Sequence, residues 1–433
     1  MRDQGENALM DTAIVLFNRD LRVHDHPALA AACDRAARVV PLFVLDPAVP
    51  EGQRHGFLLE CLADLRASLR ARGGDLVVRQ GDVVRETMRL ATELGAAAVF
   101  AAADVSSLAR RREERFAGER IEFLRFPGVT VVPPAELLPS GAPAKRGDHY
   151  RVFTPYWRAW QRHVRRPQLP PPRRVRIPEG LAVGRLPDPD GRGAMPGGES
   201  AARERAARWL RQGLDDYADG RDDLAGDRTS RLSPYLRFGC LSPLELACRA
   251  ERSEEFVRQL CWRDFHHQVT YAFPQINREN YRHGERRWRH DEDALQAWQA
   301  GMTGLPIVDA GMRQLLAEGW MHNRARLIVA AYLVRRLGLD WRDGARHFFE
   351  LLLDGDVADN SGNWQWVAGT GNDTRPNRSF NPLRQARRYD PMGDYVRRHV
   401  PELAGLPAEH IHEPWRLPTP PPGYPPRLDG PDE

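Results

Sequence analysis

The first 135 residues alternate short apolar runs with segments of helical periodicity, and this alternation constrains the fold more than any other feature of the chain. The apolar runs, which predict strands, cover residues 13–17, 38–45, 75–79, 97–103 and 130–133. The segments with helical spacing cover residues 27–37, 56–71, 83–94 and 106–119. Strands that alternate with helices form a parallel sheet with helices on both faces. We therefore predict a doubly wound α/β domain over residues 10–135.

Ligands of such sheets bind beyond the carboxyl ends of the strands. Arg19, Asp20 and Asp104 follow predicted strands and would lie at that edge. No G-x-G-x-x-G follows the first strand, so we do not expect a classical dinucleotide site there.

Residues 136–199 are rich in Pro, Arg and Gly, which predicts an inter-domain linker. Within it, residues 145–176 hold ten Lys and Arg residues against one acid, Asp148. Five aromatic residues are interleaved with them: Tyr150, Phe153, Tyr156, Trp157 and Trp160. This mixture suits a surface that faces phosphate, although for this segment alone we prefer a solvated linker.

Helical periodicity takes over after residue 200 and predicts an all-helical domain over residues 200–415. The expected helices lie near residues 200–215, 242–251, 253–272, 291–300, 306–318, 321–337, 341–353 and 392–399. The proline-rich tail, residues 416–433, is expected to be disordered.

Three groups of polar and aromatic residues recur in the helical half. The first is Gln259, Trp262 and Arg263, which are three and four residues apart and share a helix face. The other two groups are Asn323, Arg324, Arg326 and Leu327, and then Asp354, Asp356 and Asn360 in a turn, followed by Trp364 and Trp366. Each group alone is better explained as a structural network, or as an Asp-Gly turn beside a Trp-rich core. Three groups in one domain predict a functional site.

The 433 residues, 42% of them hydrophobic, are enough for two or more domains. No run approaches the roughly 18 apolar residues of a membrane span, and the first residues contain acids and amides where a secretory signal is apolar. We therefore expect a cytoplasmic, monomeric protein without a membrane partner. The five cysteines contain no C-x-x-C pair, so we expect neither a metal site nor a disulfide framework.

Four long segments resemble the signature motifs of the DNA photolyase/cryptochrome family. They are RTSRLSPYLRFGCLSP (228–243), RQLCWRDFHHQV (258–269), GMTGLPIVDAGMRQLLAEGWMHNRARL (301–327) and DGDVADNSGNWQW (354–366). FNRDLRVHDHPAL (17–29) resembles the opening strand and helix of the family, so the resemblance covers about residues 13–415. It implies an N-terminal antenna-chromophore domain, a long linker and a C-terminal FAD- and DNA-binding domain. The chain is most similar to a class I cyclobutane pyrimidine dimer photolyase.

The resemblance implies a bent FAD inside the helical domain. The positions that match FAD-binding residues of the family are Tyr217, Thr229, Ser230, Leu232, Ser233, Arg326, Asp354, Asp356 and Asn360. Hydroxyls and backbone N–H groups of the T-S-x-L-S segment would hold the phosphates. Asn360 would lie near flavin N5, where a neutral amide accepts the N5 proton without adding a second negative charge.

The resemblance also implies light-dependent repair, in which photoexcited reduced FAD gives an electron to a pyrimidine dimer flipped out of DNA. Trp262 and Trp366 match the two indoles that clasp the dimer. The other positions that match lesion or DNA contacts are Gln259, Arg263, Asn323, Arg324 and Leu327. Binding to DNA that contains pyrimidine dimers is expected to weaken with salt.

Three further tryptophans, Trp364, Trp341 and Trp288, match the chain that carries electrons to oxidised FAD in the family. With Asn360 and Gln259 they form the catalytic set that the resemblance implies. Packing in the core is the alternative for the three indoles.

Two departures from the family pattern leave an alternative function open. The usual dimer-repairing enzyme has a glutamate where this chain has Gln259, and a methionine where it has Leu327. Glutamine donates a hydrogen bond but cannot deliver a proton, so a cryptochrome-like blue-light photoreceptor with weak or no repair is the alternative. The short tail disfavours it. Asn323 and Leu327 also replace the two histidines of (6-4) photolyases.

A second, light-harvesting chromophore would occupy the first domain. Arg19 and Asp104 match positions used by deazaflavin-binding members, whereas Ser107 and Leu108 stand where folate-binding members carry an Asn-Glu pair. Deazaflavin is therefore favoured over folate, and a flavin or an empty site remains an alternative.

Overall fold

The computed structural model describes residues 9–49, 52–139, 148–189, 193, 195–282, 286–372 and 380–429. The chain divides into two compact units, each discontinuous in sequence. The first unit comprises Met1–Ala144, Arg158–Arg208 and Leu232–Glu251. The second comprises Lys145–Trp157, Trp209–Arg231 and Arg252–Glu433.

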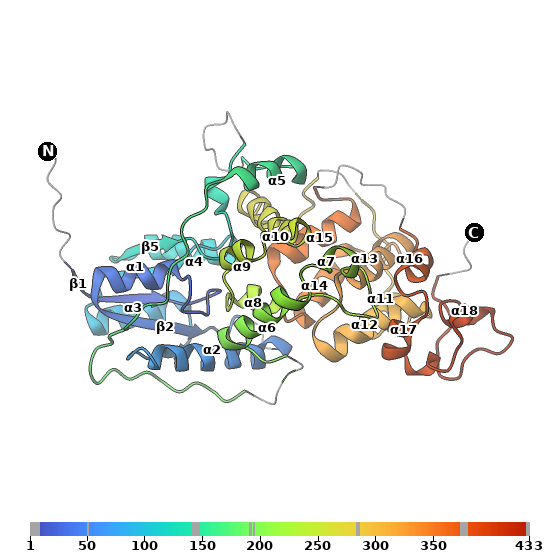
Figure 1. Cartoon of the computed structure of the whole chain (residues 1–433), viewed down its shortest axis with the longest axis horizontal. Coiled ribbons are helices and arrows are strands. Elements are labelled where there is room, and N and C mark those ends of the chain that lie inside the picture. The colour runs from blue at the N-terminus through green and yellow to red at the C-terminus, as the bar shows by residue number, and fades with distance from the viewer. Residues whose placement is uncertain are drawn as a thin grey trace. The chain divides into compact units, whose positions relative to one another are not determined.

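A five-stranded parallel sheet forms the centre of the first unit (Figure 1). Its strands are β1 (Met10–Leu16), β2 (Ala36–Leu45), β3 (Val77–Gln80), β4 (Ala98–Ala102) and β5 (Glu122–Phe126). They pair in the order β3-β2-β1-β4-β5, with Ile14 in register with Val40 on one side and Val99 on the other. The order reverses between β1 and β4, which is where open α/β sheets place a ligand crevice. The predicted parallel sheet is confirmed.

The connecting helices are α1 (Pro27–Arg35), α2 (Gln53–Arg70), α3 (Val83–Leu94) and α4 (Ser107–Ala117). α3 has the predicted limits because both of its ends are determined locally. Asp82 caps the first turn by accepting from Arg85 N, and Gly95 ends the helix in a left-handed conformation with φ 59°.

The predicted strand at residues 130–133 is wrong. The last strand is β5 (Glu122–Phe126), and residues 129–132 form bends. Val129, Val131 and Val132 are buried, so this apolar run packs into the core without joining the sheet. β5 lies at the edge of the sheet and its residues are exposed or half-buried, which explains its weaker apolar signal.

Described residues of the linker run along the first unit. Val39 N donates to Arg176 O at 2.7 Å, and Val78 N donates to Val183 O at 2.8 Å. Helix α6 (Glu199–Gln212) begins in the first unit, which also contains α8 (Ser233–Phe238) and α9 (Pro243–Arg249). The basic residues Lys145 and Arg146 of the linker lie outside the described residues.

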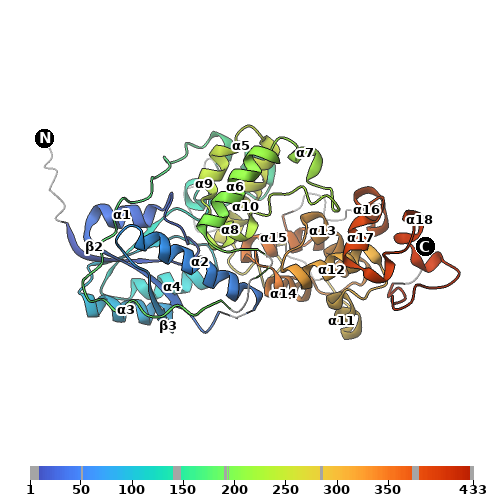
Figure 2. The same cartoon turned by 60° about the horizontal axis from the view of Figure 1, so that its bottom comes forward.

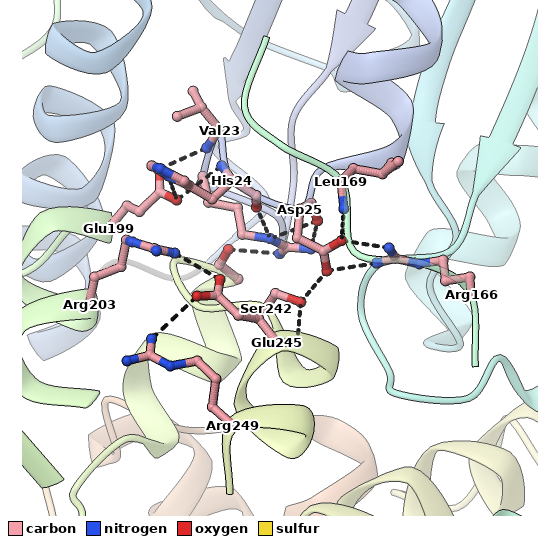
Figure 3. A network of polar contacts seen from close by, with 12 residues as sticks. Val23, His24, Asp25, Arg166, Leu169, Glu199, Arg203, Ser242, Glu245 and Arg249 are labelled. Atoms are coloured by element: carbon pink, nitrogen blue, oxygen red, sulfur yellow. Dashed lines mark hydrogen bonds and ion pairs between the residues drawn. The ribbon is translucent and has the colours of Figure 1, made fainter. Parts of the chain in front are cut away.

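A buried carboxylate, Asp25, connects the loop after β1 to the linker and to α9 (Figure 3). Its backbone is left-handed, with φ 48°. Arg166 donates two hydrogen bonds to its carboxylate, at 2.5 and 2.8 Å, and Leu169 N donates a third at 3.0 Å. Ser242, which caps α9, donates to the same carboxylate. Burial opposes ionisation of Asp25, but the hydrogen bonds from Arg166 and Ser242 outweigh it and lower its pKa.

A second buried carboxylate, Glu199, binds the same loop (Figure 3). It accepts from Val23 N at 2.7 Å and His24 N at 3.1 Å, and its Oε1 is 2.8 Å from His24 Nδ1. Burial opposes ionisation of Glu199, yet the contacts with His24 and Val23 lower its pKa below the usual value. The first residue of α6 is thereby tied to the loop that follows β1.

The second unit is helical, as predicted. Its helices are α7 (Tyr217–Gly220), α10 (Glu254–Ala272), α11 (Glu292–Ala300), α12 (Pro306–Glu318), α13 (Asn323–Ala331), α14 (Trp341–Leu351), α15 (Val357–Ala368), α16 (Pro382–Tyr389), α17 (Asp394–His399) and α18 (Ala408–Ile411). A π-helical turn, Tyr332–Arg336, extends α13. One large hydrophobic cluster joins α12, α13, α14 and α15. None of the helices within the described residues combines the length and the hydropathy needed to cross a membrane.

The proline-rich composition predicts a disordered tail, but residues 417–429 are bound to the second unit. Tyr424 Oη donates to Asp309 Oδ2 at 2.5 Å, and Leu428 N donates to Thr303 O at 3.0 Å. Asp429 forms an ion pair with Arg336 at 3.0 Å. Tertiary hydrogen bonds therefore order a segment whose own sequence forms no regular element.

Candidate functional site

The predicted site residues of the second unit lie on a contiguous set of helices. α10 packs against α7 and α15, and α15 also packs against α13 and α14 (Figures 1 and 2). α15 begins at Val357 and is capped by Asp356, which follows the Asp-Gly turn after α14. Asp354 and Asp356 lie in that turn as expected, whereas Asn360 lies in the first turn of α15, because the Asp356 cap starts the helix earlier.

Arg326 of α13 and Asp354 form a bidentate ion pair. The distances are 3.1 Å from Nη1 to Oδ1 and 2.8 Å from Nη2 to Oδ2. Arg326 Nε also donates to Met321 O at 2.9 Å, which leaves the guanidinium little freedom. The Asp354 side chain is only 6% exposed, so its carboxylate is largely shielded from water and is oriented by the Arg326 guanidinium. Two residues expected to bind the same cofactor are therefore in direct contact.

Asp356 is buried and caps α15. Its Oδ1 accepts from Ala358 N at 2.8 Å and from Asp359 N at 3.0 Å. Its Oδ2 lies 3.7 Å from His267 Nε2 on α10. His267 was not predicted from the sequence, although it lies four residues after Arg263 and therefore on the same face of α10.

The ligand atoms of His267, Asp356 and Asp359 all lie within 4.8 Å of one another. This group could reach a single cation, but positive charge is already present. Arg263 Nε is 4.0 Å from Asp359 Oδ2, and the N-terminus of α15 faces Asp356. We therefore assign no metal to it.

Asn360 is held by α14. Its Nδ2 donates to Ala345 O at 2.8 Å. One N–H of the amide is bonded to the neighbouring helix, which fixes the orientation of the amide group. The side chain is half-buried.

Thr229 and Ser230 lie on a strained segment of the second unit. The residues around them, Asp227 and Arg231, have left-handed backbones, with φ 46° and 50°. Such conformations cost on the order of 1–3 kcal/mol each and persist where their surroundings hold them. Arg231 supplies that support through ion pairs with Asp227 at 2.6 Å and Glu318 at 2.8 Å. Backbone held in this way is typical of ligand-binding segments.

The remaining cofactor candidates divide between the units. Leu232 and Ser233, at the start of α8, belong to the first unit, where Leu232 is buried and Ser233 is exposed. Tyr217 belongs to the second unit and packs edge-on against Phe256 of α10, with ring centroids 5.3 Å apart. Burial raises the pKa of Tyr217 to about 12, so its hydroxyl stays protonated and can donate.

The three tryptophans of the expected electron chain share one hydrophobic cluster. Trp341 and Trp364 are buried in it, and Trp288 is partly buried against it. Trp341 Nε1 donates to Asn280 Oδ1 at 3.0 Å, and the Arg286 guanidinium lies 4.7 Å from the Trp288 ring. Trp366 and Leu327 are partly buried against the same cluster.

Sequence reasoning did not single out Trp298, which is fully buried in this cluster. Its ring lies 6.1 Å from that of Trp364, and its Nε1 donates to Val329 O at 3.0 Å. No local pattern in the sequence distinguishes Trp298 from the tryptophans that match motif positions.

The predicted lesion contacts lie on α10 and α13, except Trp366, which lies on α15. Gln259 is exposed, and Trp262 is half-buried one turn later. Asn323 is exposed as the first residue of α13, where His322 forms the cap by accepting from Arg324 N at 3.1 Å. These positions leave polar side chains at the surface of both helices.

Arg324 is held by two residues that the sequence did not indicate. Asp222 Oδ1 accepts from its Nε at 3.1 Å and its Nη2 at 2.8 Å. The Tyr389 ring lies 4.4 Å from its guanidinium carbon. Asp222 therefore offsets part of the positive charge expected to meet phosphate.

In the first unit, Arg19 and Asp104 form an ion pair. Arg19 Nη1 lies 3.2 Å from Asp104 Oδ1, just beyond the carboxyl ends of β1 and β4. Asp104 Oδ1 also accepts from Val105 N at 2.6 Å. The pair marks the point where the strand order reverses.

Comparisons with known proteins agree with this arrangement. Residues 13–174 match the family described as DNA photolyase, and residues 256–424 match the FAD binding domain of DNA photolyase. A deoxyribodipyrimidine photo-lyase of Streptomyces griseus is 50% identical, over 94% of this chain and 93% of that protein. A cryptochrome DASH of Natronomonas pharaonis is 37% identical over 94% of each.

A solved structure shows the same fold. The crystal structure of an archaeal photolyase from Sulfolobus tokodaii superimposes with a TM-score of 0.87 and 30% identity, over 97% of this chain and 96% of that one. That protein holds two FAD molecules, which imply a novel light-harvesting cofactor there.

Proposed function

The chain belongs to the DNA photolyase/cryptochrome family, and we propose that it is a deoxyribodipyrimidine photo-lyase that repairs cyclobutane pyrimidine dimers in DNA under light. The observation that carries the proposal is the packing of α10, α13, α14 and α15 in the second unit. It brings Arg326 to Asp354, and His267 to Asp356, in the region that matches an FAD-binding domain.

The residues of the second unit fit a flavin nucleotide. Thr229 and Ser230 would offer hydroxyls to the phosphates, for which the Thr229 hydroxyl must turn away from Asp227 Oδ1, to which it donates at 3.2 Å. Tyr217 would offer a protonated hydroxyl. The Arg326–Asp354 pair and the Asp356 carboxylate would lie by the flavin ring and the ribose. When bound, reduced FAD supplies the electron that light releases. Leu232 and Ser233, which the resemblance also implies, belong to the first unit, and their role at the cofactor stays a prediction from the motif.

Asn360 tunes the redox chemistry in this proposal. Its Nδ2 donates to Ala345 O, which holds the amide in place, and the carbonyl Oδ1 would accept the proton at flavin N5 when the cofactor is bound. Because the amide is neutral, it binds that proton without adding a charge beside an anionic ring.

The protein would bind a dimer flipped out of the duplex. Trp262 and Trp366 restack the unpaired bases, and Gln259 and Leu327 contact the lesion. Asn323 and Arg324 would contact the lesion and its flanking phosphates. Arg263, whose Nε lies 4.0 Å from Asp359 Oδ2, would contact the DNA or the lesion. Affinity from the arginines falls as salt rises.

Trp288, Trp341 and Trp364 would carry electrons inward to reduce oxidised flavin. They share one apolar cluster in which water is excluded around the two inner indoles. The half-buried Trp288 is the member nearest to solvent.

The proposal is tested by incubating reduced protein with an ultraviolet-damaged thymine oligomer under blue light. Recovery of thymine absorbance is followed against a sample kept in the dark and against an undamaged oligomer. Light-dependent recovery with turnover supports repair. Failure to bind damaged DNA, together with no recovery in light, contradicts it.

A blue-light photoreceptor is the second candidate, because Gln259 replaces the glutamate of the usual repair enzyme and the chain is also similar to a cryptochrome. A glutamine cannot deliver a proton to a thymine carbonyl. Light-dependent photoreduction and tight binding to dimer DNA without any turnover would favour this second candidate.

We further propose that a second chromophore binds beside Arg19 and Asp104. The two residues form an ion pair at the reversal of the strand order. Arg19 and Asp104 match positions of deazaflavin-binding members, and Ser107 and Leu108 replace the Asn-Glu pair of folate-binding members, so deazaflavin is favoured over folate. A second flavin is the alternative.

A further inference from the structure

One face of Trp262 is covered by Phe153. The two rings are parallel, with an interplanar angle of 3° and centroids 3.6 Å apart. Aromatic pairs usually adopt offset or edge-on geometries with centroids about 4.5–7 Å apart. At 3.6 Å the phenyl ring lies directly over the indole, so a ligand base can stack only on the opposite face of Trp262.

The stack is held from two further directions. Phe265 meets Phe153 and Trp262 edge-on, at 5.7 and 5.5 Å and 87° in both cases. Trp157 is stacked beside Phe153 at 6.5 Å, and the Arg258 guanidinium lies 5.5 Å from the Phe153 ring. Face-to-face rings repel through their quadrupoles, so this surrounding packing maintains the geometry.

Phe153 comes from the basic, aromatic segment that sequence analysis assigned to a solvated linker. Its side chain is only 6% exposed, whereas Trp262 remains half-buried. All of these rings belong to the second unit. A ring that is already immobilised loses less conformational entropy when a base stacks on it. The smaller entropy cost makes binding of the base tighter.

We propose that Phe153 is a positioning residue that fixes the Trp262 indole as a rigid platform for the flipped base. The inference rests on the proposed function. In this proposal Phe153, from the aromatic part of the linker, contributes to recognition of the lesion by holding Trp262. Phe153 itself does not contact the flipped base.

The test compares two variants without an aromatic ring, Phe153→Leu and Phe153→Met, with the conservative Phe153→Tyr. Dissociation constants are measured in the dark for one oligomer with a single thymine dimer and for the same oligomer undamaged. The Leu and Met variants should bind the dimer 3- to 10-fold more weakly and the undamaged oligomer equally well. Phe153→Tyr should stay within 2-fold of wild type.

A double-mutant cycle separates positioning from general stability. In a Trp262→Ala background, Phe153→Leu should cause no further loss of dimer affinity, because the platform that it positions is absent. Bound FAD per chain and the melting temperature show which variants are folded, and the Met variant substitutes for Leu if Leu fails to fold.

The inference is overturned if wild type and the folded Phe153→Leu or Phe153→Met variant bind the dimer with equal affinity. It is also overturned if Phe153→Leu lowers dimer affinity in the Trp262→Ala background as much as it does in wild type. A wild-type protein that binds damaged and undamaged DNA alike contradicts the proposed function itself, and the inference falls with it.

Discussion

At the scale of single residues, Trp262 joins an exposed helix face to a packed aromatic cluster. Phe153 and Phe265 hold its ring, and Gln259 lies exposed one turn before it. This combination suits a side chain that binds by stacking and does not merely fill a core.

Trp262→Ala should weaken binding to dimer-containing DNA by more than tenfold. Stacking of an aromatic ring on a base contributes about 1–3 kcal/mol, and about 1.4 kcal/mol corresponds to tenfold in affinity. Filter binding or fluorescence anisotropy in the dark measures the change. Unchanged affinity in a folded, FAD-loaded variant would remove Trp262 from the lesion site.

Trp288→Phe should slow photoreduction of oxidised FAD and leave repair by chemically reduced enzyme unaffected. Trp288 is half-buried at the edge of the cluster that contains Trp341 and Trp364, and phenylalanine is much harder to oxidise than tryptophan. Flash absorption of the flavin gives the first rate, and recovery of thymine absorbance gives the second. Loss of both activities would indicate a folding defect instead.

At the scale of elements, the contact between α10 and α15 depends on Gly362. A Cβ atom added there would lie 2.2 Å from His266 Nδ1, and the His266 side chain is itself buried. The absence of a side chain at Gly362 therefore allows the helices that carry Trp262 and Asn360 to approach closely.

Gly362→Ala should destabilise the second unit, because overpacking costs typically about 1–3 kcal/mol and outweighs the gain of about 0.5–1 kcal/mol from replacing a helical glycine. Urea unfolding followed by tryptophan fluorescence measures the loss.

Gly56→Ala in α2 of the first unit is the control, since nothing lies within 4 Å of the added Cβ, and its unfolding is followed by circular dichroism because tryptophan fluorescence reports on the second unit. It should be neutral or stabilising. Equal behaviour of the two variants would show that α10 and α15 are not closely packed at Gly362.

At the scale of the whole molecule, the two units differ in their response to acid. In the second unit, burial lowers the pKa of His266, His322 and His347 from 6.5 to about 4. The unfolded chain therefore binds more protons than the folded one between pH 6.5 and about 4, so the stability of this unit falls as pH falls through that window.

In the first unit, the pKa values of Asp25 and Glu199 are lowered from 3.8 and 4.5. The stability that these carboxylates contribute is present above their unfolded pKa values and is lost only at lower pH. On acidification, the second unit should lose stability first.

Tryptophan fluorescence reports almost entirely on the second unit, because only Trp160 of the 11 tryptophans lies in the first. Thermal unfolding by fluorescence should shift down between pH 7 and pH 5, and His347→Leu should reduce that shift. A fluorescence transition that is constant from pH 7 to pH 4.5 would contradict the assignment.

Much of the fold is determined by signals that lie close together in the sequence. α3 has its predicted limits because its cap residues, Asp82 and Gly95, are adjacent to it. Alternation of apolar runs with helical segments was sufficient to predict a parallel sheet. Long contiguous motifs were sufficient to identify the family. The individual site residues were assigned by motif position, and their roles stay predictions.

Only the tertiary structure decided which distant segments meet. β5 lies at Glu122–Phe126 and not at the more apolar residues 130–133, because pairing with β4 selects the strand. The contacts of Arg326 with Asp354, of Arg324 with Asp222 and of Trp262 with Phe153 join separate segments. Propensity and periodicity act over a few residues, whereas hydrogen bonds, ion pairs and ring stacking between distant segments depend on how the helices pack, which no local pattern encodes.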